Sequence, residues 1–156
     1  MTPAVDQLVR SGVTHRVVSY NHDPNAESFG REAVVALGLN AAEVFKTLVV
    51  DLGSGGLAVA VVPVDSQLNL KAVAKAAGAK KAKMADPAAV ERSSGYVLGG
   101  VSPLGQKRTL PTFVDRSALD LEEMHVSAGR RGLEVALSPN DLVDLLDATP
   151  ALIAAN

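Results

Sequence analysis

The 156-residue chain contains no cysteine, which excludes disulfides, thiolate metal ligands and a cysteine nucleophile. Of its three histidines, no two are spaced as in the zinc motif HExxH. The P-loop, the dinucleotide-binding glycine motif and the GxSxG nucleophile elbow are also missing. We therefore expect no metal and no cofactor.

Aromatic residues are few, at five, and the core must be built from alanine, valine and leucine. Hydrophobic residues at 47% and charged residues at 21% are typical of a globular chain. Its length predicts one domain over residues 1–156. The N-terminus carries Asp6 and Arg10 without a long apolar run, and no stretch approaches a membrane span, so we expect a cytoplasmic protein with no membrane partner.

The net charge of −2 does not indicate a nucleic-acid binder, but the charge is unevenly distributed. Residues 1–70 hold four basic and seven acidic side chains, and residues 109–156 hold three and eight. Residues 71–108 hold eight basic and two acidic side chains, a local charge of +6. This basic middle is either a solvated helix face or a phosphate-binding patch.

Apolar periodicity and turn residues predict an α+β fold with a mixed or antiparallel, partly barrel-like sheet surrounded by helices. Helices are expected from Pro3 to Gly12 and over 31–37, 70–77, 87–92 and 141–146, with a short helical turn from Asn40 to Phe45. Strands are expected over 13–20, 47–52, 57–62, 111–115, 124–127 and 133–137. The strict βαβ alternation of a doubly wound fold is absent.

Lys46 interrupts an apolar segment where a strand is expected to begin. It either extends to solvent or holds a phosphate or carbonyl oxygen at a rigid position. The segment 99–105, GGVSPLG, is either a structural turn or a cradle whose backbone N–H groups converge on an oxygen. Lys107 and Arg108 follow this loop and add positive charge beside it.

Two further features lie in turns. The pair Arg130-Arg131, flanked by glycines, joins two expected strands and is interpreted as a charged hairpin tip. Tyr20 and Phe29 flank a loop, where a ring can act as a packing lid or stack on a base.

These features, in this order, resemble the YbaK family, the freestanding relatives of the prolyl-tRNA synthetase editing domain. The resemblance runs almost end to end. Within the family, the sequence is most similar to the bacterial Cys-tRNA(Pro) deacylases. The strings that carry it include YNHDP at 20–24, KTL at 46–48, LKAVAK at 70–75, GGVSPLGQK at 99–107 and RGL at 131–133.

The resemblance implies trans-editing, the cleavage of the ester that joins a misplaced amino acid to the 3′ end of a tRNA. It implies that Lys46 acts at the terminal adenosine and that the Gly99 to Pro103 loop binds the aminoacyl carbonyl. It also implies a catalytic role at Glu134, where the family usually has Asp. The implied substrate-binding positions are Tyr20, Phe29, Thr47, Gly100, Val101, Ser102, Pro103 and Ser127.

For a cysteinyl substrate, the resemblance implies that the substrate's own thiol attacks its carbonyl and leaves as a thiolactone. The implied partners are the acceptor end of an aminoacyl-tRNA and prolyl-tRNA synthetase. Two alternatives stay open: a deacylase for another small amino acid of the alanine or serine type, and a non-catalytic module that binds a tRNA end or a synthetase.

Overall fold

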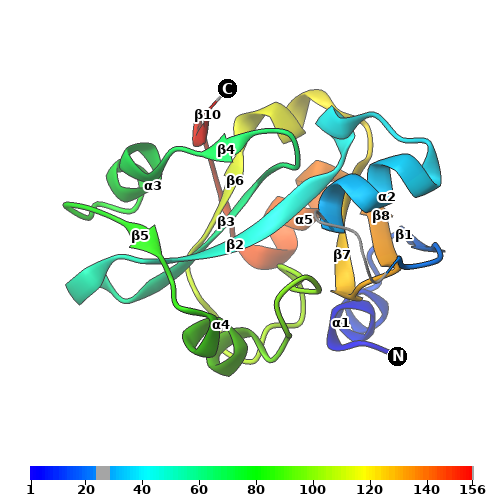
Figure 1. Cartoon of the computed structure of the whole chain (residues 1–156), viewed down its shortest axis with the longest axis horizontal. Helices are drawn as coiled ribbons and strands as arrows, with labels where there is room; N and C mark the ends of the chain where they lie inside the picture. Colours follow the sequence, from blue (N-terminus) through cyan, green and yellow to red (C-terminus); the bar gives the residue numbers. More distant parts are fainter. Residues whose placement is uncertain (24–28, 156) are drawn as a thin grey trace.

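The computed structural model describes residues 1–23 and 29–155, and at Phe29 the backbone alone. Within these residues the α-helices are α1 (Pro3–Ser11), α2 (Phe29–Leu37), α3 (Leu70–Ala76), α4 (Pro87–Ser94) and α5 (Pro139–Leu146) (Figure 1). Short 3-10 turns are η1 (Ala41–Glu43), η2 (Gly53–Gly55) and η3 (Arg116–Asp120). The strands are β1 (His15–Ser19), β2 (Phe45–Asp51), β3 (Leu57–Pro63), β4 (Gln67–Leu68), β5 (Lys83–Met84), β6 (Thr112–Asp115), β7 (Met124–Arg130), β8 (Leu133–Leu137), β9 (Thr149–Ala151) and β10 (Ala154–Ala155).

The described strands form one large mixed sheet and two smaller sheets. The large sheet has the order β5-β2-β3-β6-β9, in which β2 and β3 form an antiparallel hairpin while β3–β6 and β6–β9 are parallel. A second sheet has the order β1-β8-β7 and is antiparallel, and β4 pairs with β10. A parallel bridge between Val44 and His125 joins the start of β2 to β7, so that the two larger sheets meet edge to edge.

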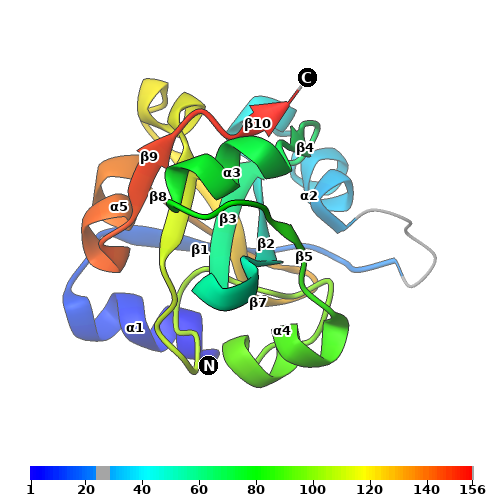
Figure 2. The same cartoon turned by 90° about the vertical axis from the view of Figure 1, so that its left-hand side faces the viewer.

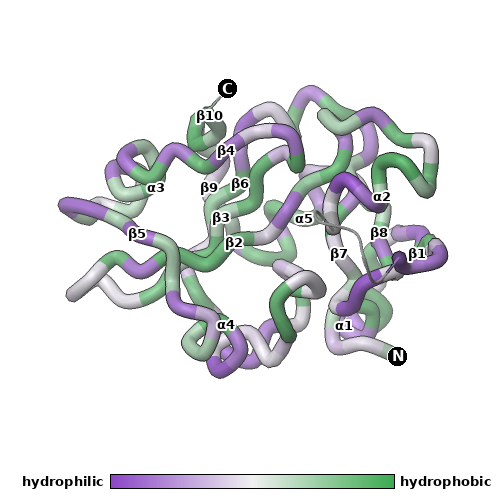
Figure 3. Tube along the Cα trace, viewed as in Figure 1, coloured by the Kyte–Doolittle hydropathy of each residue, from purple (hydrophilic) through white to green (hydrophobic). Residues whose placement is uncertain are grey.

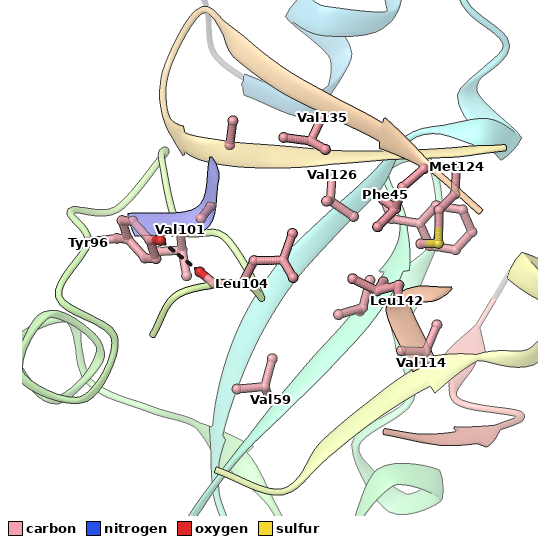
Figure 4. Packing of buried hydrophobic residues seen from close by; sticks show 14 of the residues in the cluster. Phe45, Val59, Tyr96, Val101, Leu104, Val114, Met124, Val126, Val135 and Leu142 are labelled. Atoms are coloured by element: carbon pink, nitrogen blue, oxygen red, sulfur yellow. Dashed lines mark hydrogen bonds between the residues drawn. The ribbon is translucent and has the colours of Figure 1, made fainter. Parts of the chain in front are cut away.

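The central strand β3 is buried on both faces, which explains its unbroken apolar run. Val59 and Val61 belong to a core between the two larger sheets, together with Phe45, Leu142 of α5 and the loop residue Leu104. Figure 4 labels all of these except Val61. The alternate residues of β3 pack on the opposite face against Val73 of α3, the helix that lies in front of β3 in Figure 2. Figure 3 shows hydrophobic chain along β3, whereas hydrophilic and hydrophobic stretches alternate along α3 and α4.

The α+β class and the mixed sheet expected from the sequence are confirmed. Thr2 caps α1 through its side chain, Pro3 opens the helix, and Gly12 ends it at φ 67°. The turn that begins at Asn40 ends at Glu43 rather than at Phe45, because Val44 and Phe45 already belong to the strand pairing of the core. The two- and three-residue strands β4, β5, β9 and β10 were not expected, since segments this short carry no readable periodicity.

Candidate active site

A pocket of about 330 Å³ opens where the two larger sheets meet. Its walls come from the start of β2, the loop after α4, the tip of the β7–β8 hairpin and the segments on either side of residues 24–28. The lining residues are Tyr20, Gly30, Phe45, Lys46, Thr47, Leu48, Leu98, Gly99, Val101, Ser127, Arg130, Arg131 and Glu134. Segments far apart in the chain thus bring cations, hydroxyls and one carboxyl group together, in a volume typical of small-ligand sites.

Lys46 projects from β2, where it pairs in register with Val62 of the buried strand β3. Strand pairing therefore fixes its backbone, and the side chain is half-buried. Burial lowers the pKa of Lys46, and the negative charge of Asp65 acts in the opposite direction. The result is an ammonium group that has lost part of its hydration and faces the pocket, which suits it to bind an anionic or carbonyl oxygen of a ligand.

The loop at Gly99 contributes backbone donors to the pocket. Gly99 adopts φ 91°, a conformation that favours glycine. A Cβ at Gly100 would lie 2.9 Å from the Cα of Arg130, so only glycine allows the loop to pack this closely on β7. The Gly100 N–H donates to the Val97 carbonyl over 3.0 Å, whereas the N–H groups of Gly99 and Val101 have no acceptor among the described residues. Two donors thus remain available to a ligand oxygen.

Two contacts hold the far end of this loop rigid. The Ser102 hydroxyl accepts a hydrogen bond from the Leu104 N–H, and the Tyr96 hydroxyl donates to the Leu104 carbonyl at 2.7 Å. The second bond is drawn in Figure 4. Because the loop is tied into the core, the orientation of its backbone donors is set before a ligand arrives.

Glu134 is the single carboxyl group among the described lining residues. It lies on β8 between Val18 of β1 and Ser127 of β7, and it is only 5% exposed. No described residue forms a hydrogen bond or ion pair with its side chain, and burial raises its pKa to about 8. Glu134 is therefore mainly a neutral carboxylic acid at pH 7, able to donate a hydrogen bond to a ligand.

Three hydroxyl groups complete the wall. The Thr47 hydroxyl is buried and has no partner among the described residues. The Ser127 hydroxyl accepts from the Gly129 N–H at 3.1 Å, within the bulge between Ser127 and Arg130. Tyr20 is half-buried and burial raises its pKa, so its hydroxyl stays protonated. No histidine or other strong base hydrogen-bonds to any of these hydroxyls in the described part of the chain, so the pocket shows no activated protein nucleophile.

The structure brings most of the expected site residues together and leaves others outside the pocket. Those that line it are Tyr20, Lys46, Thr47, Gly99, Val101, Ser127 and Glu134. Gly100 and Ser102 are buried and do not line the pocket. Pro103 instead borders a second cavity, of about 380 Å³, between α1 and α5. The expected role of Phe29 concerns a side chain that lies outside the described residues.

The positive charge of the pocket does not come from the segment suggested by the sequence. None of the eight basic residues in 71–108 lines the pocket, and Arg108, expected beside the glycine loop, lines the second cavity. The pocket cations are Lys46 and the hairpin pair Arg130 and Arg131. The glycine-flanked pair was a visible signal, but its position at the pocket depends on the order β1-β8-β7, which sequence spacing does not give.

The described residues contain neither a metal-binding cluster nor a membrane-spanning helix. No group of three or more histidine, cysteine, aspartate or glutamate side chains is placed to hold a metal ion. No described helix is both long and apolar enough to cross a bilayer.

The fold and the pocket define an α+β protein whose ligand site lies between two sheets and is lined by cationic side chains. Solved structures share this fold over nearly the whole chain. One, titled "Crystal structure of hypothetical protein APE2540", matches at a TM-score of 0.87 and 27% identity, covering 98% of this chain and 99% of its own. Another, described as a "putative trans-editing enzyme for prolyl tRNA synthetase", matches at a TM-score of 0.86 and 24% identity, covering 100% and 99%.

The family model described as "Aminoacyl-tRNA editing domain" matches residues 23–145. The chain belongs to this family, and it is an aminoacyl-tRNA deacylase, a hydrolase. A relative in Enterococcus faecalis, named "Putative Cys-tRNA(Pro)/Cys-tRNA(Cys) deacylase EbsC", is 39% identical over 110 residues, which are 70% of this chain and 67% of the relative. The resemblance read from the sequence is therefore confirmed at the level of the family.

Proposed function

We propose that this protein removes cysteine from mischarged tRNA(Pro) by cleaving the ester at the tRNA 3′ end. The observation that carries the proposal is the combination inside one pocket: a partly desolvated Lys46, unengaged backbone donors at Gly99 and Val101, and a neutral acid at Glu134, without an activated protein nucleophile among the described residues. The substrate named for the Enterococcus relative supports the choice of a cysteinyl ester.

In the proposed reaction the nucleophile comes with the substrate. The cysteinyl sulfur attacks its own carbonyl carbon, an S–C bond forms, and the bond from that carbon to the ribose oxygen breaks. The thiol proton ends on the ribose oxygen, so the products are a cyclic thiolactone and tRNA with a free 3′ end. Because the thiol and the carbonyl are already in one molecule, holding them in a reactive pose supplies most of what the enzyme must provide.

The protein residues then have distinct proposed roles. The N–H groups of Gly99 and Val101 stabilise the negative charge that develops on the carbonyl oxygen. Lys46 holds the terminal adenosine end, and Glu134 donates a hydrogen bond to the substrate. Tyr20, Thr47 and Ser127 border the space for the aminoacyl group. The closely packed loop behind them, with Gly100, Ser102 and Pro103, keeps the donors aligned.

A deacylation panel tests the proposal. Purified protein is incubated with tRNA(Pro) charged with cysteine, alanine or proline, and the products are separated into thiolactone and free amino acid. We expect rapid loss of cysteine with thiolactone appearing before free cysteine. Selective loss of alanine would assign another small amino acid, and tRNA binding without cleavage of any ester would contradict an editing enzyme.

Prolyl-tRNA synthetase is the proposed partner, because a chain of this size presents little surface for selecting one whole tRNA. We expect a ternary complex of this protein, the synthetase and tRNA(Pro). A pull-down of the synthetase loaded with tRNA(Pro) that recovers none of this protein would contradict the partnership and leave the deacylase activity unaffected.

A further inference from the structure

Arg131, at the tip of the β7–β8 hairpin, lines the pocket and is held there by a residue from a distant segment. Its Nη1 donates a hydrogen bond to Nε2 of His22 at 3.0 Å. The hairpin tip and the His22 segment are close because the Tyr20 N–H donates to the Gly132 carbonyl, also at 3.0 Å. A Cβ at Gly132 would lie 2.9 Å from the Tyr20 carbonyl oxygen, so the glycine allows this approach.

His22 is in turn held by Glu32 of α2. The Nδ1 atom of His22 lies 2.8 Å from Oε1 of Glu32, and the other oxygen, Oε2, accepts from the Asp23 N–H at 2.7 Å. The Glu32 side chain is 8% exposed and that of His22 is 25% exposed. The hydrogen bond from His22 lowers the pKa of Glu32, which keeps the carboxylate ionised.

The direction of these bonds fixes the state of the imidazole. A guanidinium can only donate, so Nε2 of His22 must accept from Arg131. The single ring proton therefore sits on Nδ1 and is donated to Glu32, a tautomer that a carboxylate partner favours. The chain Glu32–His22–Arg131 thus orients one guanidinium, using residues that have no other place in the proposed reaction.

We propose that His22 and Glu32 are positioning residues that hold Arg131 to bind the phosphodiester on the 5′ side of the aminoacylated nucleotide. This inference rests on the proposed function. In an aminoacylated RNA 3′ end, a single ribose separates the ester from the phosphodiester, so an ester bound in the pocket brings that phosphodiester close to it. Arg131 suits that group better than the other two pocket cations. Its planar guanidinium can donate two hydrogen bonds to one phosphate, whereas the Lys46 ammonium is a point charge. Arg130 is exposed, and no described residue holds its side chain as His22 holds that of Arg131.

The first experiment compares two cysteinyl substrates, one with and one without the phosphodiester. The first is a minihelix of the tRNA(Pro) acceptor stem, and the second is the 3′-cysteinyl ester of adenosine. For Arg131→Ala we expect KM for the minihelix to rise about tenfold with kcat little changed, and no change with the adenosine ester. Equal losses on both substrates, or no loss on either, would overturn the proposal. Arg116→Ala, which removes an exposed arginine of η3, is the matched control.

The second experiment tests the supporting chain. His22→Leu should reproduce the KM rise of Arg131→Ala, and the double variant should be no worse than either single one. His22→Gln should restore the wild-type KM, since its amide can accept from Arg131 and donate to Glu32. Glu32→Gln provides an independent variant if His22→Leu lowers the melting temperature. Additive effects, or a failure of His22→Gln to restore KM, would show that the chain does not position Arg131.

A binding measurement separates this inference from the proposed function. Deacylated minihelix is titrated against wild type and Arg131→Ala at several salt concentrations. Loss of one phosphate contact should reduce the slope of log affinity against log salt by about 0.7 to 1. This change requires no catalysis, so it would support the phosphate contact even if the cysteinyl esters were not cleaved. An unchanged slope with an active enzyme would refute the contact and leave the proposed function standing.

Discussion

Asp115 and Glu134 are equally hidden from water, each 5% exposed, but the structure treats them in opposite ways. Asp115, at the end of β6, accepts from the Ser117 hydroxyl at 2.6 Å and from the N–H groups of Ile153 and Ala154 at 3.0 and 2.9 Å. Burial alone would raise its pKa, but these hydrogen bonds outweigh burial and lower it. Glu134 has no such donors among the described residues, and burial raises its pKa to about 8.

The difference separates a structural carboxylate from one that faces a ligand. At Asp115 the protein provides every donor, and the side chain joins the end of β6 to the segment that forms β10. The carboxyl group of Glu134 has no hydrogen-bond partner among the described residues and remains available to a ligand in the pocket. An unsatisfied buried polar group costs stability, and such groups are concentrated at functional sites.

The largest expected effect lies at the pocket and is produced by Lys46→Ala. Because Lys46 holds the terminal adenosine end, its loss leaves the ester misplaced relative to the backbone donors, and a misplacement of this kind can cost a factor of about 100 in rate. We expect a loss of this size in Cys-tRNA(Pro) deacylation, with the far-UV spectrum and melting temperature close to wild type because the side chain is only half-buried. Lys46→Arg should recover only part of the rate, since the guanidinium is larger and differently hydrated. A wild-type rate for Lys46→Ala would remove this residue from the site.

Glu134→Gln should remove a loss of stability that the wild type shows as the pH rises. Most carboxyl groups in proteins have a lowered pKa and lose their contribution to stability as the pH falls. The folded pKa of about 8 lies above the unfolded value of 4.5, so the contribution of Glu134 is intact below pH 4.5 and is lost as the pH rises through 8. At about 1.4 kcal/mol per pKa unit, the wild type should lose several kcal/mol over this range and the variant should not. Urea unfolding at pH 5 and pH 9 measures the difference.

The same variant tests the proposed role of the acid. A neutral hydrogen-bond donor should lose activity in the wild type as the pH rises through about 8. Glutamine also donates but is a weaker acid, so Glu134→Gln should be several-fold slower near pH 6.5 and should lose this pH dependence. A wild-type rate and pH profile in the variant would make Glu134 a packing residue.

Asp115→Ala should act on stability alone. The change leaves the N–H groups of Ile153 and Ala154 without their acceptor, and we expect a loss of about 2–3 kcal/mol in the free energy of unfolding. Deacylation measured well below the melting temperature should be unchanged, because Asp115 does not line the pocket. Asp120→Ala, at an exposed acid of η3, is the control. A loss of rate without a loss of stability would contradict the division between the two carboxylates.

Helix ends and hairpins could be predicted from the sequence where the contacts that determine them are local. The cap at Thr2 and the stop at Gly12 lie within one helix, and the hairpin of β2 and β3 follows from two β-rich runs separated by glycines. Contacts that depend on the order of strands in the sheets could not be predicted from the sequence. His22 and Arg131 are 109 positions apart, and Asp115 and Ile153 are 38 apart. Nothing in the local pattern at these residues distinguishes a held side chain from one in solvent.

The smallest expected effect concerns the buried residue His125, which extends the comparison from carboxyl groups to a basic side chain. It is 3% exposed, its Nδ1 has no partner among the described residues, and Nε2 is 3.9 Å from Glu123. Burial lowers the pKa of His125 from 6.5 despite the charge of Glu123. The unfolded chain therefore takes up the proton first, and stability that is present above pH 6.5 is lost as the pH falls below it.

Glu134 changes stability in the opposite direction over the same interval, so the effect of His125 has to be isolated from it. In the Glu134→Gln background we expect the free energy of unfolding to fall between pH 7 and pH 5, and to fall less when His125→Leu is added. Unfolding by urea at the two pH values measures both. Equal slopes with and without His125 would show that the imidazole is hydrated in the folded protein, and the contrast between satisfied and unsatisfied buried groups would then be confined to the two carboxyls.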